Sequence, residues 1–357
     1  MIALAVDAGG TSTRAVVVAG DGTCLGFARS GSGNPVSAGL GLAAASVAAA
    51  AGEALARAGV SGAEAELCLV AMAGGMAPAE EQTYRDHLSA LGLSVPLVFE
   101  GDALAIFCSG TWLDTGYALI VGTGAAAIRV EGGRTVVERD GLGWLLGDDG
   151  SGFWIGHHVV RAALAALEGR GPATKLTDLV LADVNGSPSP GWATRGRPPQ
   201  LAAVMELLYQ GRPVELARFA PLAFQAAPDP VADRIVASAA GALATTLASV
   251  MRPVASGPVV FGGGTLVHNP GLARRVAATL PTEPQLVTDG LAGAAVLALR
   301  AAGQVVDADV FTRIVQSLEQ LRGGDPFVDA RTPPRARSLG EGVEDNASQL
   351  AVRPQLA

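Results

Sequence analysis

The stretch LAVDAGGTSTRAVVVAGDGTCLGFARS, residues 4–30, decides the fold class of this chain. Val and Ala fill three runs and Gly with Thr or Asp fills the breaks, which predicts three consecutive strands joined by turns. The same order returns in ALIVGTGAAAIRVEGGRTVVERDG, residues 118–141. A three-strand motif that occurs once in each half of the chain predicts two related α/β domains.

Both repeats carry a glycine-rich turn that suits an anion. Glycine lets backbone N–H groups approach a phosphate closely, and Thr and Ser hydroxyls add donors. A hairpin turn explains one such segment equally well, but its repetition favours a polyphosphate held from both sides. We therefore expect a nucleotide in a cleft between the domains. The residues expected to hold it are Gly9, Gly10, Thr11, Ser12 and Thr13 in the first turn and Gly122, Thr123 and Gly124 in the second.

The composition excludes several classes of protein. At 357 residues, with 49% hydrophobic and 16% charged residues, the chain is long enough for about two domains with sizeable cores. The net charge of −8 argues against nucleic acid and against an anionic membrane surface as partners. The only lysine, Lys175, follows Thr174 and not a glycine loop, so the chain has no P-loop. If the chain binds ATP, we expect backbone amides, hydroxyl groups and metal-bound carboxylates to hold it.

The cysteines and the first residues bear on location. Cys24, Cys68 and Cys108 are far apart and lack the CxxC spacing of a metal site. They fit a reducing compartment, and the chain begins with a predicted strand and no basic leader, so we expect a cytoplasmic protein. The Ala-rich residues 40–58 contain charged side chains and predict a soluble helix, not a membrane span.

The pattern of runs and breaks predicts three parts. A first domain is expected over residues 1–114, a second over 115–322 and a mobile tail over 323–357, with a Pro-, Gly- and Ser-rich surface loop over 185–199. After the first three strands we expect a polar loop over 31–39, helices over 40–58, 78–91 and 102–109, and strands over 67–71 and 95–99. In the second domain we expect helices over 151–167, 199–209, 213–226, 230–251, 270–280 and 290–301, and strands over 259–261 and 285–287.

Two aspartates lie where predicted strands end. Asp7 ends the first strand and is the expected Mg²⁺ site, with the ion held mostly through water. Asp102 lies where an apolar strand meets a helix. An N-cap is the plain role for an aspartate there, and a general base for an alcohol is the functional one, because strand carboxyl ends face the cleft in α/β folds. The two roles are compatible.

Two further glycine-rich segments are candidates for ligand contacts. GDDGSGFW, residues 147–154, precedes a helix, and its adjacent Asp148 and Asp149 indicate either a capped helix start or a polyol or cation site. A second run follows the strand of residues 259–261 and permits close approach of a planar base or its ribose, although a loose turn needs no more. Its members are Gly262, Gly263 and Gly264.

Five segments in order resemble a known family. DAGGTSTRAVV, FEGDALAIF, IVGTGAAAIRV, LLGDDGSGFWIG and VVFGGGTLVHN are similar to the BadF/BadG/BcrA/BcrD-type ATPase and N-acetylglucosamine kinase family of the sugar kinase/Hsp70/actin superfamily. The resemblance covers roughly residues 2–302, and LLGDDGSGFWIG, which is similar to the family's GDEGS signature, is its specific part. It implies two RNase H-like domains, of the actin/hexokinase type, that close on ATP–Mg²⁺ and a sugar. It also implies a homodimer.

The resemblance implies a role for each motif. Both Gly–Thr turns hold the phosphates, and the glycine run lies against the adenosine. Asp102 matches the catalytic aspartate, which also contacts the sugar. Asn34, in the loop after the third strand, matches an asparagine that binds sugar hydroxyls, and Asp148 matches the sugar-binding aspartate of GDEGS.

The chain departs from the family pattern near the sugar. Asp149 replaces the glutamate of GDEGS, and Leu142 replaces the tryptophan of the family's GGWG, with Asp140 before it. The missing aromatic wall disfavours an N-acetyl group, whereas the acidic residues Asp140, Asp148 and Asp149 suit an ammonium group. The chain therefore most resembles the actinobacterial glucosamine kinases, which predicts ATP-dependent phosphorylation of D-glucosamine at O6. The alternatives are N-acetylglucosamine or glucose as the sugar, an ATPase that activates a partner enzyme, and a sugar-sensing regulator without catalysis.

Overall fold

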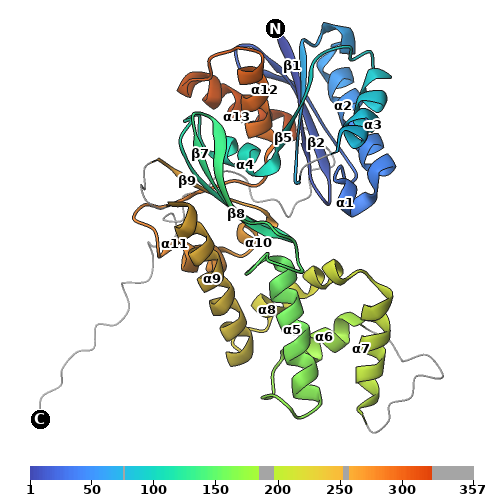
Figure 1. Cartoon of the computed structure of the whole chain (residues 1–357), viewed down its shortest axis with the longest axis vertical. Coiled ribbons are helices and arrows are strands. Elements are labelled where there is room, and N and C mark those ends of the chain that lie inside the picture. The colour runs from blue at the N-terminus through green and yellow to red at the C-terminus, as the bar shows by residue number, and fades with distance from the viewer. Residues whose placement is uncertain (75–76, 185–196, 252–256, 324–357) are drawn as a thin grey trace, which may run out of the picture.

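The computed structural model describes residues 1–74, 77–184, 197–251 and 257–323. Figure 1 shows two sheets that follow one another along the molecule, with a group of helices beyond the second sheet. The strands of the first sheet are β1 (Ile2–Ala8), β2 (Thr13–Ala19), β3 (Cys24–Ser30), β4 (Leu67–Met72) and β5 (Leu97–Gly101). Those of the second are β6 (Gly116–Val121), β7 (Ala125–Glu131), β8 (Arg134–Asp140), β9 (Val259–Gly262) and β10 (Gln285–Leu286).

The two sheets share one topology. The first has the order β3-β2-β1-β4-β5 and the second the order β10-β9-β6-β7-β8, so β6 takes the place of β1. In each sheet an antiparallel meander of three strands is extended by two parallel strands. The central strand β1 is buried on both faces from Ala3 to Ala8, which explains its nearly uninterrupted apolar sequence. The repeat seen in the sequence is therefore a repeat of structure.

The described helices surround these sheets. Those of the first half are α1 (Pro35–Ala38), α2 (Leu40–Ala58), α3 (Pro78–Ser89) and α4 (Asp102–Gly110), with a 3-10 turn η1 (Gly62–Glu64). Those of the second half are α5 (Gly152–Leu167), α6 (Leu176–Val184), α7 (Pro199–Gln210), the 3-10 helix η2 (Pro213–Phe219), α8 (Ala220–Gln225), α9 (Pro230–Met251), α10 (Gly264–Val267), α11 (Pro270–Ala277), α12 (Leu291–Ala301) and α13 (Ala308–Gly323).

The last helix after each sheet packs mainly against the other sheet. α4 follows β5 but lies against β6, β7 and β9, whereas α12 follows β10 but lies against β1, β2 and β4. The two helices contact each other at Gly293, where any Cβ would collide with the backbone oxygen of Ala105. Glycine is required there because the helix backbones touch. The two halves thus share one central apolar core, to which Phe107, Val260 and Leu299 belong.

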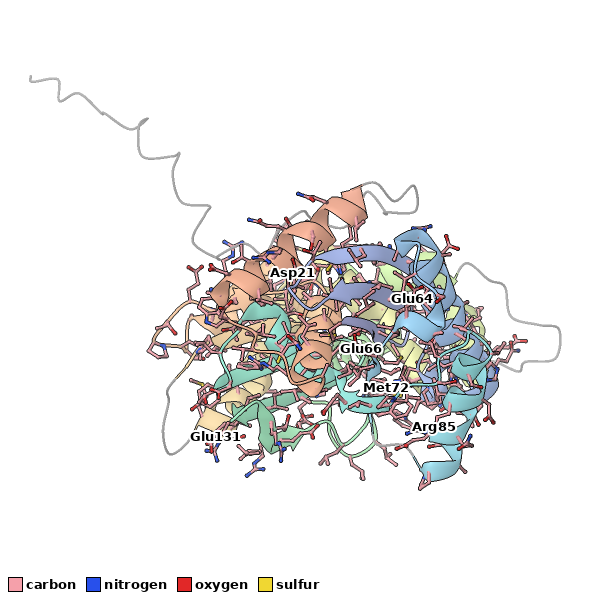
Figure 2. The ribbon with its side chains drawn as sticks, turned by 90° about the horizontal axis from the view of Figure 1, so that it is seen from above. Asp21, Glu64, Glu66, Met72, Arg85 and Glu131 are labelled. Atoms are coloured by element: carbon pink, nitrogen blue, oxygen red, sulfur yellow. The ribbon has the colours of Figure 1, made fainter. Side chains whose placement is uncertain are left out.

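The C-terminal described helix also returns to the first sheet. α13 buries Ile314 and Leu318 and lies along β3. Its Ser317 hydroxyl accepts a hydrogen bond from Cys24 N at 2.9 Å, and Figure 2 shows Asp21 beside this helix. The predicted boundary between residues 114 and 115 stays a prediction, and the packing of α12 and α13 places part of the second segment on the first sheet.

By length and composition alone, α2 and α9 are the two helices within the described residues that could cross a membrane. Both contribute to the apolar cores. Ala43, Val47 and Ala50 of α2 belong to the cluster against β2 and β3, and Ile235 and Leu243 of α9 belong to the cluster beneath β6 and β7. Their apolar residues are thus accounted for by packing within this fold.

The local structure differs from the sequence-based expectation in several places. The expected helix over 213–226 is a 3-10 helix followed by α8, because Pro221 lacks the N–H that a continuous helix needs. The expected polar loop over 31–39 contains the short helix α1. The helices α6 and α13 were not expected, and β5 begins at Leu97 rather than at residue 95. The predicted tail and most of the predicted loop over 185–199 lie outside the described residues.

Candidate active site

The first glycine-rich turn joins β1 to β2 and presents its backbone to solvent. Gly10 and Thr11 are exposed, and within the described residues the N–H groups of Gly10, Thr11 and Ser12 have no hydrogen-bond acceptor. Gly9 N donates to Ser12 O at 3.1 Å, which closes the turn. Thr13 differs from these residues because it is fully buried and its hydroxyl donates to Gly31 O at 2.8 Å. The turn offers free backbone donors, and Thr13 holds it in place.

The second turn, between β6 and β7, has the same character. Gly122 N donates to Gly124 O at 2.9 Å, and Thr123 is exposed between them. The carbonyl of Gly122 accepts from the Thr265 hydroxyl at 2.8 Å and from Gly152 N at 2.9 Å. The turn is therefore fixed by α5 and α10 from behind, while its tip stays open to a ligand.

The glycine run after β9 divides into buried and exposed residues. Gly262 is buried in the strand, where a Cβ would press against the side chain of Ile106. Gly263 has a φ of 89° and lies so close to Val121 that only glycine fits. Gly264 is exposed. Of the three glycines expected against the adenosine, Gly262 thus serves packing, and Gly263 and Gly264 form the surface of the turn.

Asp102 begins α4 directly after β5. Burial raises the pKa of Asp102, the N–H of Ala103 opposes that shift, and the charge of Glu138 adds to it. Glu138 belongs to β8, so the second sheet contributes to the electrostatic surroundings of a carboxylate from the first. A carboxylate with a raised pKa at the meeting of two lobes is a candidate general base.

Asn34 caps α1 and is almost fully buried. Its Oδ1 accepts a hydrogen bond from Val36 N at 2.8 Å, and no described residue accepts from its Nδ2. The residue before it, Gly33, donates to Gly9 O at 3.1 Å and accepts from the buried Tyr84 hydroxyl at 3.0 Å. The loop that carries Asn34 is therefore hydrogen-bonded to the first glycine-rich turn.

The three aspartates expected near a sugar have different roles in the structure. Asp140 accepts from Asp148 N with Oδ1 at 2.6 Å and from Asp149 N with Oδ2 at 3.0 Å. Asp148 is 7% exposed and its Oδ1 accepts from Ala125 N at 3.0 Å, which ties it to the second turn. Burial raises the pKa of Asp148, and the charges of Asp140 and Asp149 add to the rise. Asp149 is the one of the three that is exposed.

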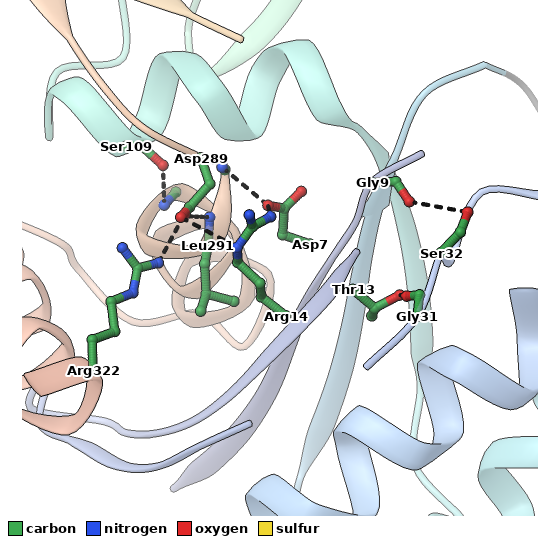
Figure 3. Close-up of polar contacts among 12 residues, drawn as sticks. Asp7, Gly9, Thr13, Arg14, Gly31, Ser32, Ser109, Asp289, Leu291 and Arg322 are labelled. Carbon is green, nitrogen blue, oxygen red and sulfur yellow. Dashed lines mark hydrogen bonds and ion pairs between the residues drawn. The ribbon is translucent and has the colours of Figure 1, made fainter. Parts of the chain in front are cut away.

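Asp7 ends β1 and is 7% exposed. Its Oδ2 accepts from Gly290 N at 3.2 Å and lies 3.5 Å from Nη1 of Arg14 (Figure 3). Burial raises the pKa of Asp7, and the guanidinium of Arg14 opposes this shift. The charges of Asp289 and Asp102 raise the pKa of Asp7 further. Asp7 and Asp102 are therefore close enough to influence each other.

Three charged residues near Asp7 were not expected from the sequence: Arg14, Asp289 and Arg322. Burial alone raises the pKa of Asp289, but the guanidinium groups of Arg322 and Arg14 outweigh it and hold that pKa below its usual range. Asp289 stands between a strand and a helix, as Asp102 does, so the rule that selected Asp102 also selects Asp289. Arg14 lies opposite Asp7 in the hairpin of β1 and β2, so the predicted pairing of these strands was a signal for it. Arg322 carries no comparable signal, because its partner Asp289 lies 33 residues away.

The donor set fits Mg²⁺ bound together with a nucleotide. The described residues contain no group of three or more His, Cys, Asp or Glu side chains placed to hold a metal ion. Mg²⁺ usually keeps several waters and takes one or two carboxylates plus phosphate oxygens. One buried carboxylate, Asp7, beside a turn with free N–H groups satisfies that requirement.

Two curated relatives are similar over part of the chain. The glucosamine kinase of Vibrio cholerae is 30% identical over 182 residues, which cover 50% of this chain and 60% of that protein. The N-acetyl-D-glucosamine kinase of Dictyostelium discoideum is 36% identical over 92 residues, which cover 26% of this chain and 29% of that protein. The chain thus spans less than two thirds of the length of each of these relatives.

The similarity to solved structures extends further. The crystal structure of a candidate N-acetylglucosamine kinase from Chromobacterium violaceum superimposes with a TM-score of 0.62 at 25% identity, over 84% of this chain and 98% of that one. This match confirms the predicted fold of two RNase H-like domains of the actin/hexokinase type. The family model described as BadF/BadG/BcrA/BcrD ATPase matches residues 4–298, most of the described chain. With its repeated sheets, its two glycine turns and this match, the chain belongs to the BadF/BadG/BcrA/BcrD ATPase family.

Proposed function

We propose that this protein is an ATP-dependent kinase of amino sugars, with D-glucosamine as its substrate and O6 as the acceptor. The observation that carries the proposal is the position of Asp102, a carboxylate of raised pKa at the start of α4 with Glu138 of the other lobe nearby. The relatives named glucosamine kinase and N-acetyl-D-glucosamine kinase support the substrate class.

Each site residue has a stated task in this reaction. Asp102 orients the sugar hydroxyl and takes its proton as the hydroxyl attacks the γ-phosphorus. The free N–H groups of the first turn and the exposed tip of the second bind phosphate oxygens. When bound, ATP would supply the phosphoryl group and Mg²⁺ would neutralise its charge, with Asp7 as the carboxylate that would hold the ion. Gly263 and Gly264 lie against the adenosine.

The preference for glucosamine rests on the loop between β8 and α5. Leu142 is 66% exposed where the family pattern has a tryptophan, so the loop presents no aromatic ring at that position. The carboxylates of Asp140 and Asp148 accept hydrogen bonds from backbone N–H groups of the protein, whereas Asp149 is exposed. Asp149 is therefore the carboxylate we assign to the ammonium group, and the amide of Asn34 is assigned to a sugar hydroxyl.

Two alternatives are distinguished by specific observations. N-acetylglucosamine or glucose as the substrate requires the same catalytic residues and differs only at the loop that holds Leu142 and Asp149. An ATPase that activates a redox partner through an iron–sulfur cluster needs accessible cysteine ligands. Cys24, Cys68 and Cys108 are free thiols, all buried, and burial raises the pKa of each. The kinase is therefore favoured. A cytoplasmic homodimer remains part of the proposal.

Release of ADP, measured with ATP–Mg²⁺ and one sugar at a time, tests the proposal. The sugars are glucosamine, N-acetylglucosamine and glucose, with a reaction that contains no sugar as the control. Turnover is expected to be highest with glucosamine and to fall to background without sugar. Preference for N-acetylglucosamine overturns the role given to Leu142 and Asp149, and ADP release that ignores the sugar overturns the kinase itself.

A further inference from the structure

A chain of ion pairs joins the end of β1 to the last turn of α13. The guanidinium of Arg14 lies between two aspartates, with Nη1 3.5 Å from Asp7 Oδ2 and Nε 3.5 Å from Asp289 Oδ2. Asp289 Oδ1 lies 2.7 Å from Nη2 of Arg322. Asp7 belongs to β1, Arg14 to β2 and Arg322 to α13, and Asp289 lies just before α12. Figure 3 shows the four side chains as one continuous series.

This series of ion pairs is largely shielded from water. The side chains of Asp7 and Asp289 are 10% and 11% exposed, and those of Arg14 and Arg322 are 24% and 25% exposed. Exposed ion pairs contribute little to stability or geometry because solvent screens them, whereas buried ones fix their partners and are costly to break. Removing one member therefore changes the ion pairs that surround Asp7.

The series of ion pairs determines which oxygen of Asp7 is free to bind a further partner. Oδ2 is occupied by Arg14 and by the N–H of Gly290 at 3.2 Å. No described residue hydrogen-bonds to Oδ1, and Figure 3 shows this oxygen turned away from Arg14. Gly290 follows Asp289 directly, and a Cβ at Gly290 would lie 3.3 Å from Oδ1, so glycine leaves space beside that oxygen. Asp289 thus fixes both partners of Oδ2, one through an ion pair and one through the main chain.

We propose that Arg14 and Asp289 are positioning residues that aim the free oxygen of Asp7 at the metal ion bound with the nucleotide, and that Arg322 fixes Asp289 from α13. The inference rests on the proposed function in one respect, the assignment of Asp7 to Mg²⁺. Groups that orient a metal-binding carboxylate typically change metal affinity by about 10- to 100-fold when they are removed. The last described helix, which packs against β3 and α12, thereby takes part in preparing the metal site.

Binding of Mn²⁺–ATP in the absence of sugar, measured by electron paramagnetic resonance of the free Mn²⁺, is the direct test. We expect Asp289→Asn to weaken Mn²⁺–ATP binding by about tenfold, with the KM for glucosamine within about twofold of the parent value. Arg322→Gln keeps Asp7, Arg14 and Asp289 and is expected to weaken binding in the same direction by a smaller factor. If Asp289→Asn does not fold, the Mn²⁺–ATP affinity of Arg322→Gln tests the inference in its place.

The matched control is Asp21→Asn, which removes the ion pair between Asp21 and Arg313, 3.2 Å long, on the same helix α13. If the chain of ion pairs only attached α13, Asp21→Asn would weaken Mn²⁺–ATP binding as much as Asp289→Asn does, and the inference would be wrong. Unchanged binding in folded Asp289→Asn or Arg322→Gln, with weakened binding in Asp7→Asn, also overturns it but leaves the proposed function standing. Unchanged binding in Asp7→Asn overturns the assignment of Asp7 to the metal.

Discussion

Asp140 holds the main chain of Asp148, because its Oδ1 accepts the Asp148 N–H at 2.6 Å while its Oδ2 accepts the Asp149 N–H at 3.0 Å. Asp140 and Asp148 have positive backbone φ angles of 61° and 60°, which residues other than glycine adopt rarely. Such a conformation persists only where the surroundings enforce it. The acidic segment is therefore a rigid loop, and its members have separate roles.

The first prediction separates those roles. Asp149→Asn is expected to raise the KM for glucosamine by about tenfold and to leave turnover of glucose unchanged, because only the ammonium group loses a charge partner. Asp140→Asn is expected to impair turnover of both sugars equally. One backbone N–H of the loop then faces the NH2 group of the asparagine, which cannot accept a hydrogen bond. Steady-state kinetics on both sugars checks this, and an equal effect of both substitutions on both sugars would contradict the assignment of Asp149.

The second prediction concerns the catalytic base. Asp102→Asn is expected to lower kcat by roughly a hundredfold or more, because the amide cannot take the proton of the sugar hydroxyl. Sugar binding measured by calorimetry is expected to change little, since the amide keeps the size and one acceptor of the carboxylate. Turnover near the parent value would remove Asp102 from the mechanism.

The third prediction concerns pH. Burial raises the pKa of Asp102, so the ionised form that accepts a proton is lost as the pH falls through a value above the ordinary 3.8 of an aspartate. The acid limb of the plot of kcat against pH is therefore expected at a higher pH than an exposed aspartate would give. Glu138→Gln removes a negative charge that raises the pKa of Asp102, so the limb moves to lower pH. Glu319→Gln, the same change on an exposed position of α13, is the control and is expected to leave the limb in place.

The fourth prediction concerns stability. Asp229 is 7% exposed and caps α9, where its Oδ1 accepts from Val231 N and Ala232 N at 2.9 Å each. Its Oδ2 accepts from Lys175 N at 2.9 Å, and both oxygens lie 3.0 Å from the Thr174 hydroxyl. Asp229→Ala leaves these buried donors unsatisfied and is expected to cost about 2–4 kcal/mol of unfolding free energy. The control Asp233→Ala, on the exposed side of the same helix, is expected to cost less than about 1 kcal/mol.

The pH dependence of that loss provides a second check. Burial raises the pKa of Asp229, but its hydrogen bonds outweigh burial and lower that pKa below 3.8. A group with a lowered pKa stabilises the fold above its unfolded value and loses this contribution as the pH falls through its folded value. The difference between Asp229→Ala and the parent is therefore expected to shrink below pH 3.8 in urea titrations. A difference that is constant down to the lowest pH would contradict the charged cap.

Local patterns determined the elements of this protein. The repeated Val- and Ala-rich runs with glycine breaks predicted both meanders, and the structure confirms them as β1 to β3 and β6 to β8. The same patterns placed both glycine turns and Asp102 at strand ends, because alternation, turn chemistry and caps act over a few residues. The sequence-based prediction left out α6 and α13, although Val310, Ile314, Leu318 and Leu321 of α13 recur every three or four positions, which is the spacing of an amphipathic helix.

Only the tertiary structure decided how these elements serve the site. It packed α4 and α12 against each other's sheets, placed Asp289 against Arg14 and buried Thr13. It also directed Asp140 and Asp148 to backbone N–H groups, so that a cluster of acidic residues in the sequence became one exposed carboxylate, Asp149, and two that hold the loop. The physical reason is that these contacts depend on the path of the chain between remote residues. The Gly290–Asp7 hydrogen bond, for example, joins positions 283 residues apart, and no local periodicity specifies such a pair.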